Sequence, residues 1–187
     1  MTCQVDATPE SLRSYLAHDQ LRNGSELLIR AINPQDRDAL QEGLHRLSPE
    51  SAYYRFFRYK KDLSEQELEY FTAPDFDRHV ALVAVDEDLE LVVGVTRYFS
   101  CDDLALRTAE ITLAVEDDYH GLGVGTLLLG HLVEIGRAAG YQEFRAAVLG
   151  ENYKMLDVLY NMNLPLRRSM EGDTVEVHLS LTEPPVI

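Results

Sequence analysis

The stretch His120-Gly121-Leu122-Gly123-Val124-Gly125-Thr126 decides the fold of this chain. It follows an alternating apolar segment, 108–115, and opens the segment 126–139, whose leucines recur at helical spacing. Three glycines let the backbone turn sharply and approach a ligand closely. Because the first N–H groups of a helix lack partners and carry the positive end of its dipole, the stretch predicts a pyrophosphate site. The alternative is a tight strand–helix connection without a ligand.

Two well-known phosphate loops do not match this stretch. The dinucleotide fingerprint G-x-G-x-x-G requires a glycine where Thr126 stands. The P-loop requires glycine at 126 and lysine at 127, but residue 127 is Leu127. The spacing therefore argues against both a dinucleotide and a nucleoside triphosphate as the ligand.

The stretch does resemble the coenzyme A loop [QR]-x-x-G-x-[GA] of the GNAT N-acetyltransferase superfamily, with His120, Gly123 and Gly125 in the three defined places. Other ordered motifs of that superfamily accompany it, namely Leu113-Ala114-Val115, Glu151-Asn152 and Leu159-Tyr160. The segments 47–57, 63–72 and 77–84 resemble the acetyltransferase domain of bacterial protein lysine acetyltransferases, and this match covers about residues 26 to 181.

Two departures from the family pattern concern the cofactor and a helix end. The family has Gln or Arg at the place of His120 and often a basic residue at that of Leu122, so phosphate contacts should be weaker or come from backbone. We place the usual Gly-Phe after the last helix at Leu164-Pro165, which makes that helix end unlike the family's.

The chain of 187 residues suits one domain. We expect residues 1–24 to be a tail or loose helix and residues 25–187 to be the acetyltransferase domain. Patterns typical of strands occur at 26–32, 79–85, 91–99, 108–115, 144–149 and 173–181, with helices among them after Asn33-Pro34, after Ser48-Pro49 and at the capping box Ser64-x-x-Glu67. The order predicts an α/β fold with a mixed, mostly antiparallel sheet of six to seven strands and helices on both faces, which is the GNAT fold that the resemblance implies.

The resemblance implies acetyl-CoA as co-substrate and assigns the residues that hold it. Backbone groups of Leu113 and Val115 should bind pantetheine or polarise the thioester carbonyl. Asn152 should bind a pantetheine amide, although it is also a natural helix cap. The full expected set is Leu113, Val115, His120, Gly121, Leu122, Gly123, Val124, Gly125, Thr126 and Asn152.

Acetyl transfer to an amine requires a base, because only about one lysine in 10³ is neutral at pH 7. Glu110 is the candidate base, since it lies on the strand leading to the loop, opposite Leu113 and Val115, where similar lysine acetyltransferases place a glutamate. The alternative is a glutamate that faces solvent or pairs with Arg107. Tyr160 is the candidate acid for the leaving thiolate, and a packing role for it is equally open.

The composition of the chain indicates which kinds of binding partner are to be expected. The net charge of −15 argues against nucleic acid and anionic membranes and is compatible with a basic partner. Two cysteines and six scattered histidines form no metal-binding pattern, so we expect no metal. We see no secretion signal and no apolar run long enough to span a membrane, so we expect a cytoplasmic protein.

The chain has one dense basic stretch, made of Arg55, Arg58, Lys60 and Lys61. It could touch the adenosine phosphate or a partner, or it could form the basic face of a helix.

The leading hypothesis is an enzyme that transfers the acetyl group directly from acetyl-CoA to a protein lysine. The alternatives are an acetyltransferase for small amines and an acetyl-CoA-binding sensor without turnover. Glu110 favours turnover, whereas nothing in the sequence decides between a protein and a small amine. The oligomeric state, including a homodimer, stays open.

Overall fold

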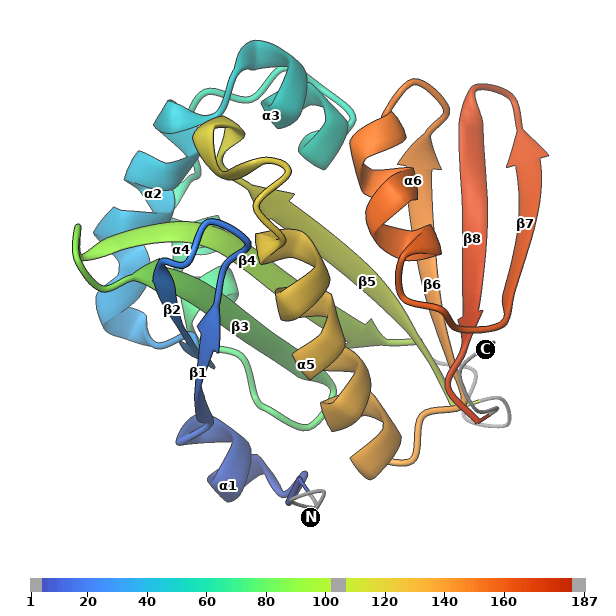
Figure 1. The fold of residues 1–187 in the computed structure, drawn as a ribbon, viewed down its shortest axis with the longest axis horizontal. Helices are drawn as coiled ribbons and strands as arrows, with labels where there is room; N and C mark the ends of the chain where they lie inside the picture. Colours follow the sequence, from blue (N-terminus) through green and yellow to red (C-terminus); the bar gives the residue numbers. More distant parts are fainter. Residues whose placement is uncertain (1–4, 102–106, 183–187) are drawn as a thin grey trace.

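A computed structural model describes residues 5–101 and 107–182, and Figure 1 shows their arrangement. One sheet of eight strands forms the centre, in the order β1-β2-β3-β4-β5-β6-β8-β7. All neighbouring strands are antiparallel except β5 and β6, which run parallel. The strands are β1 (Leu16–Gln20), β2 (Glu26–Ala31), β3 (His79–Asp86), β4 (Leu91–Ser100), β5 (Thr108–Val115), β6 (Glu143–Leu149), β7 (Leu166–Glu171) and β8 (Thr174–Ser180).

Helices cover both faces of the sheet, as the sequence predicts. On one face, α5 (Val124–Ala138) connects β5 to β6 and buries its leucines against β3, β4 and β5, while α6 (Tyr153–Tyr160) joins the same core. On the other face lie α2 (Arg37–Arg46), α3 (Pro49–Phe56) and α4 (Glu65–Thr72), which share a smaller apolar core. The short helix α1 (Pro9–Arg13) precedes β1, and two 3₁₀ turns occupy Pro34–Asp36 and Asp117–Tyr119.

The strand count exceeds the expected six to seven because β1 and β7 are additional. The segment expected to be a tail or loose helix forms α1 and the edge strand β1, which pairs with β2 from Leu16↔Arg30 to Gln20↔Glu26. Leu12 and Leu21 on either side of β1 are buried, so this segment packs on the domain. Both missed strands lie at the edges of the sheet and expose most of their side chains, so neither has the alternating pattern of a half-buried strand.

The parallel strands β5 and β6 pair over only three positions. Thr108, Ala109 and Glu110 of β5 face Glu143, Phe144 and Arg145 of β6, and the rest of β5 has no partner on β6. Figure 1 shows the two strands separating toward the end of β5 that leads into the glycine loop. The separated part of β5 exposes backbone N–H and C=O groups that a ligand can bind.

Candidate active site

A cleft of about 340 Å³ lies where β5 and β6 separate, bordered by α3 and the first turns of α6. It brings together strand, loop and helix residues that the sequence analysis singled out separately. Among the residues lining it are Glu110, Leu113, Val115, His120 and Asn152.

The glycine loop leaves the start of α5 open to an anion. Gly121 and Gly123 have φ values of 78° and 102°, a left-handed region that favours glycine. Gly123 is the N-cap of α5, no side chain caps the helix, and the N–H of Leu127 makes the first hydrogen bond, to the Gly123 carbonyl at 3.0 Å. The N–H groups before Leu127 therefore point out of the helix start toward the region that a phosphate would occupy.

The side chain of His120 bridges the end of β5 and the start of α6. Its Nε2 lies 2.9 Å from the Val115 carbonyl oxygen, which can only accept, so Nε2 carries the proton. Its Nδ1 then accepts from the ammonium of Lys154, at 3.0 Å. His120 therefore positions Lys154 beside the cleft, and both of its ring nitrogens are engaged.

Lys154 is a cleft residue that the sequence analysis missed. It stands in the first turn of α6, which contains no acidic residue. A cation there opposes the helix dipole, so its position favours a nearby anion. A lysine in the first turn of a predicted helix is the sequence feature that could have pointed to Lys154.

Glu110 is exposed and lines the cleft, while its neighbours Ala109 and Ile111 are buried in the core beneath α5. Among the described residues it forms no ion pair with Arg107, whereas its exposure agrees with the other alternative, a glutamate that faces solvent. The charge of Glu110 acts on Arg55 of α3, which also lines the cleft. Burial lowers the pKa of Arg55 to about 10, and the charge of Glu110 opposes that decrease.

Of the two side chains proposed on α6, one lies in the cleft and the other outside. Asn152 lines the cleft and also caps α6, because its side chain accepts from the Met155 N–H at 3.1 Å. Tyr160 is 41% exposed, is not among the residues lining the cleft, and accepts a hydrogen bond from Arg168 of β7 at 2.9 Å. A different tyrosine, Tyr54 of α3, lines the cleft instead.

The remaining loop residues reach a ligand only through their backbone. Val124 is 1% exposed, Leu122 packs against the core, and Gly125 allows α5 to approach Leu113 and Val158, where a Cβ would lie 3.2 Å from each. None of the residues Gly121 to Thr126 is among those that line the cleft. Their backbone contact to a phosphate stays a prediction.

The structure bears on two smaller expectations. After α6 the left-handed residue is Asn163, with φ 53°, and Leu164 beside it is buried. The left-handed residue therefore stands one position before Leu164-Pro165 and two positions after the C-cap Asn161. The basic stretch also divides, because Arg58 and Lys60 pair with Glu67 whereas Arg55 enters the cleft.

Comparison with known proteins identifies the family. The sequence profile of the acetyltransferase (GNAT) family matches residues 40–160, more than half of the chain. The chain belongs to the GNAT acetyltransferase family. Its membership makes it an acetyl-CoA-dependent N-acetyltransferase, as the sequence predicts.

Three relatives of this GNAT chain cover most of its length. It is 30% identical over 162 residues to the acetyltransferase PA5475 of Pseudomonas aeruginosa, which is 86% of each chain. It is 31% identical over 140 residues to the acetyltransferase Pat of Mycolicibacterium smegmatis, covering 75% of this chain but only 41% of Pat. The crystal structure of the GNAT domain of S. lividans PAT superposes with a TM-score of 0.82 at 30% identity, over 88% of this chain and 96% of that domain.

The site of this GNAT domain fits acetyl-CoA by its own chemistry. The open helix start and Lys154 suit a pyrophosphate, and the unpaired part of β5 suits the amides of pantetheine. Within residues 5–101 and 107–182, no group of three or more His, Cys, Asp or Glu side chains could hold a metal ion. In the same part of the chain, no helix has the length and apolar character needed to cross a membrane.

Proposed function

We propose that this enzyme acetylates a lysine side chain of a protein by direct transfer, with Glu110 as the general base. The observation that carries the proposal is the cleft in which Glu110, the part of β5 that has no partner on β6, and His120 at the start of the glycine loop meet. The acyl donor and the proton acceptor can therefore be held in one space.

The choice of lysine rests on two supporting points. The relatives named PAT and Pat are 30% and 31% identical to this chain, and one of them matches over 96% of its GNAT domain. The net charge of −15 and the exposed carboxylate of Glu110 favour a cationic acceptor. Neither point separates one basic protein from another, so the acceptor is named by its chemistry alone.

The chain's own residues supply the steps of the reaction. The N–H groups at the start of α5 and the ammonium of Lys154 bind the donor's pyrophosphate, and His120 keeps Lys154 in place. Leu113 and Val115 offer backbone groups to pantetheine and to the thioester carbonyl. Glu110 accepts the proton of the lysine ammonium, and the neutral amine attacks the carbonyl carbon. A C–N bond forms, the C–S bond breaks, and coenzyme A leaves as a thiolate that then takes a proton.

The test replaces Glu110 by Gln, which keeps the size and removes the base. We expect kcat on a lysine peptide at pH 7 to fall about 10²–10⁴-fold, the usual contribution of a general base. The loss should shrink at high pH, where the acceptor amine is already partly neutral. The dissociation constant of acetyl-CoA should stay unchanged, because Glu110 faces the acceptor side of the cleft.

Glu176→Gln provides the matched control, because Glu176 is an exposed strand glutamate on β8 outside the cleft lining. Equal rates for wild type and Glu110→Gln at pH 7 would reject Glu110 as the base. A protein that binds acetyl-CoA but transfers nothing to lysine peptides or small amines would be a sensor. Transfer to small amines alone would reject the lysine assignment while keeping the enzyme.

A further inference from the structure

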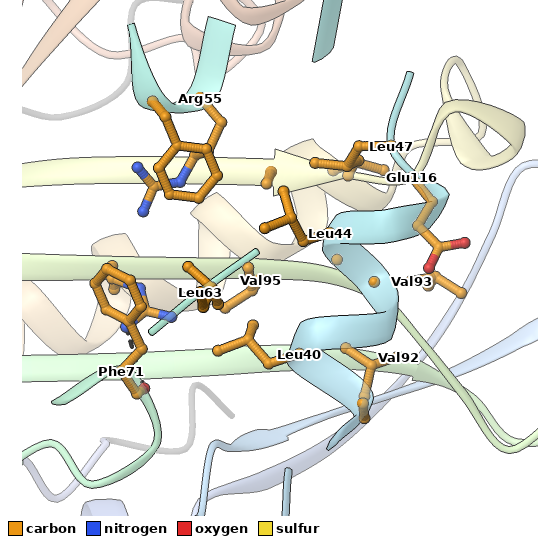
Figure 2. A pocket seen from close by; sticks show the side chains of 17 residues that line it. Leu40, Leu44, Leu47, Arg55, Leu63, Phe71, Val92, Val93, Val95 and Glu116 are labelled. Carbon is orange, nitrogen blue, oxygen red and sulfur yellow. Dashed lines mark hydrogen bonds between the residues drawn. The ribbon is translucent and has the colours of Figure 1, made fainter. Parts of the chain in front are cut away.

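A second cavity lies next to the cleft, beneath helices α2 to α4. It has a volume of about 60 Å³ and shares Leu47, Arg55, Phe56, Ala114 and Val115 with the cleft. One water needs about 10–15 Å³ on this scale, so the cavity has room for about four waters or a short carbon chain. Figure 2 shows leucine and valine side chains between its two ends, with Arg55 and Phe71 at one end and Glu116 at the other.

Arg97 lines this cavity with a buried guanidinium that lacks a counter-ion. It lies on β4 and is 2% exposed. Its Nη1 donates to the Phe71 carbonyl at 3.1 Å, and the group lies 4.5 Å from the centre of the Phe71 ring. Its Nε is buried without any hydrogen-bond partner. No carboxylate of the described residues forms an ion pair with it, an arrangement that is costly for a buried charge.

Arg55 adds a second guanidinium at the same end. It makes no hydrogen bond or ion pair within the described part of the chain, and its contacts are the Phe56 ring at 5.0 Å and the charge of Glu110. The charge of Arg55 adds to burial in lowering the pKa of Arg97 to about 9, so the two groups lie close enough to repel. Both remain protonated at neutral pH.

The other titratable groups around the cavity do not compensate this charge. Glu116 lies at the opposite end and is held by Arg46 at 2.6 Å. His79 lies 3.4 Å from Nη1 of Arg97, and burial followed by the charge of Arg97 lowers its pKa to about 4, so it is neutral at pH 7. The cavity therefore offers apolar walls that lead to an unmatched positive end.

We propose that this cavity binds the terminal carboxylate of a dicarboxylic acyl group, of the succinyl type, carried by coenzyme A. The proposal rests on the proposed function, because it uses the same cleft and the same direct transfer. The cavity and the cleft share Ala114 and Val115 of β5, along which we place pantetheine, so we place the substituent of the thioester carbonyl in this cavity. The methylenes contact the leucine and valine walls, and Arg97 and Arg55 bind the carboxylate.

Transfer of the dicarboxylic acyl group forms and breaks the same bonds as acetyl transfer. The amine nitrogen forms a bond to the acyl carbonyl carbon, and the C–S bond breaks. The amine proton passes to Glu110, and coenzyme A leaves as a thiolate that takes a proton. The terminal carboxylate is unchanged and gives the acylated lysine a negative charge.

The test compares three donors on one lysine peptide, namely acetyl-CoA, butyryl-CoA and succinyl-CoA. The last two carry four-carbon acyl chains and differ by the carboxylate. We expect kcat/KM for succinyl-CoA to exceed that for butyryl-CoA about 10-fold or more, because a charge-assisted pair to a buried group is lost in the neutral donor. Calorimetry should give a similarly lower dissociation constant for succinyl-CoA. Arg97→Met should remove both preferences and keep acetyl transfer, whereas Arg58→Met, an exposed arginine outside the cavity, should keep both.

Equal use and equal binding of succinyl-CoA and butyryl-CoA by the wild type would overturn the inference, and so would a preference that survives Arg97→Met. If Arg97→Met does not fold, the wild-type comparison and Arg55→Met decide in its place. Failure of every donor to transfer would reject the proposed function, while calorimetry would still decide the inference. Transfer from acetyl-CoA without the succinyl preference would reject the inference alone.

Discussion

At the scale of the residue, the position of one charge explains how a loop with few basic side chains can hold a diphosphate. His120 stands where the family has Gln or Arg, and its ring nitrogens are engaged by the Val115 carbonyl and by Lys154. The positive charge beside the glycine loop is therefore that of Lys154, which belongs to α6 and not to the loop. We propose that Lys154, 34 positions away from His120, offsets the weaker phosphate contact expected from the loop sequence.

Replacement of Lys154 by Met should weaken acetyl-CoA binding about 10- to 100-fold, since a hydrogen bond to a charged group contributes about 1.5–3 kcal/mol. The salt dependence of binding should also decrease, because one phosphate contact is lost. Calorimetry at two salt concentrations measures both effects. Lys61→Met, an exposed lysine outside the cleft lining, is the control and should match the wild type. An unchanged dissociation constant for Lys154→Met would place the diphosphate elsewhere.

The two tyrosines give a second residue-scale prediction. Tyr54 lines the cleft, and burial followed by the charge of Glu50 raises the pKa of its phenol, which keeps it protonated. We expect Tyr54→Phe to lower kcat several-fold if this phenol protonates the departing thiolate. Tyr160→Phe should change kcat less than twofold, because that hydroxyl contacts Arg168 outside the cleft. A larger loss for Tyr160→Phe in steady-state kinetics would restore Tyr160 as the acid.

At the scale of the element, the contact between α5 and β6 depends on a missing side chain. A Cβ at Gly136 would lie 2.4 Å from the ring of Phe144, which is fully buried, so the ring or the helix would have to shift. Gly136→Ala should therefore destabilise the fold by about 1–3 kcal/mol, the usual effect of overpacking. Gly130→Ala, in the same helix with no neighbour within 4 Å, should stabilise it by up to about 1 kcal/mol. Urea unfolding of both variants measures this, and equal shifts would contradict the close contact.

Elements with a buried face could be predicted from sequence, and elements at the edges of the sheet could not. The apolar residues of β5 alternate and those of α5 recur at helical spacing because one face of each packs on the core, whereas β3 is a continuous apolar run because both of its faces are buried. The strand β1 reads LAHDQ and β7 reads LRRSME, and both exist through pairing with a neighbour. Because backbone hydrogen bonds make this pairing, the amino-acid sequences of the two strands contain little that would predict it.

The same reasoning explains which site residues the sequence could suggest. Glu110, His120 and Asn152 lie within motifs and were found there. Lys154 and Arg97 matter because of what lies opposite them in space, which no local pattern encodes. Asn152, the N-cap of α6, lines the cleft together with Met155 and Val158 at helical spacing, and Lys154 lines it from the first turn. Tyr160 follows Val158 by two residues, about 200° around the helix, and so points elsewhere.

At the scale of the whole molecule, stability should depend on pH through buried groups on both sides of the sheet. Glu143 on β6 receives hydrogen bonds from His178, Arg167 and Arg145 that outweigh burial and lower its pKa to about 2. A carboxylate with a depressed pKa stabilises the fold above the unfolded value near 4.5 and loses that contribution as pH falls toward 2. The contribution of Glu143 is therefore lost between about pH 4.5 and pH 2.

Between pH 6.5 and 4, the protonation of His79 should account for most of the loss of folding stability. Burial, followed by the charge of Arg97, lowers its pKa to about 4, against about 6.5 in the unfolded chain. Between these values the unfolded state binds the additional proton, so stability is complete above pH 6.5 and decreases as pH falls toward 4, by up to about 3 kcal/mol. Urea unfolding at steps from pH 7.5 to 4.5 should show this decrease in the wild type and a flatter profile in His79→Gln. His18→Gln, with an exposed ring, should follow the wild type. Parallel profiles for all three proteins would show that His79 takes up its proton without cost, and that the guanidinium of Arg97 beside it does not hold it neutral.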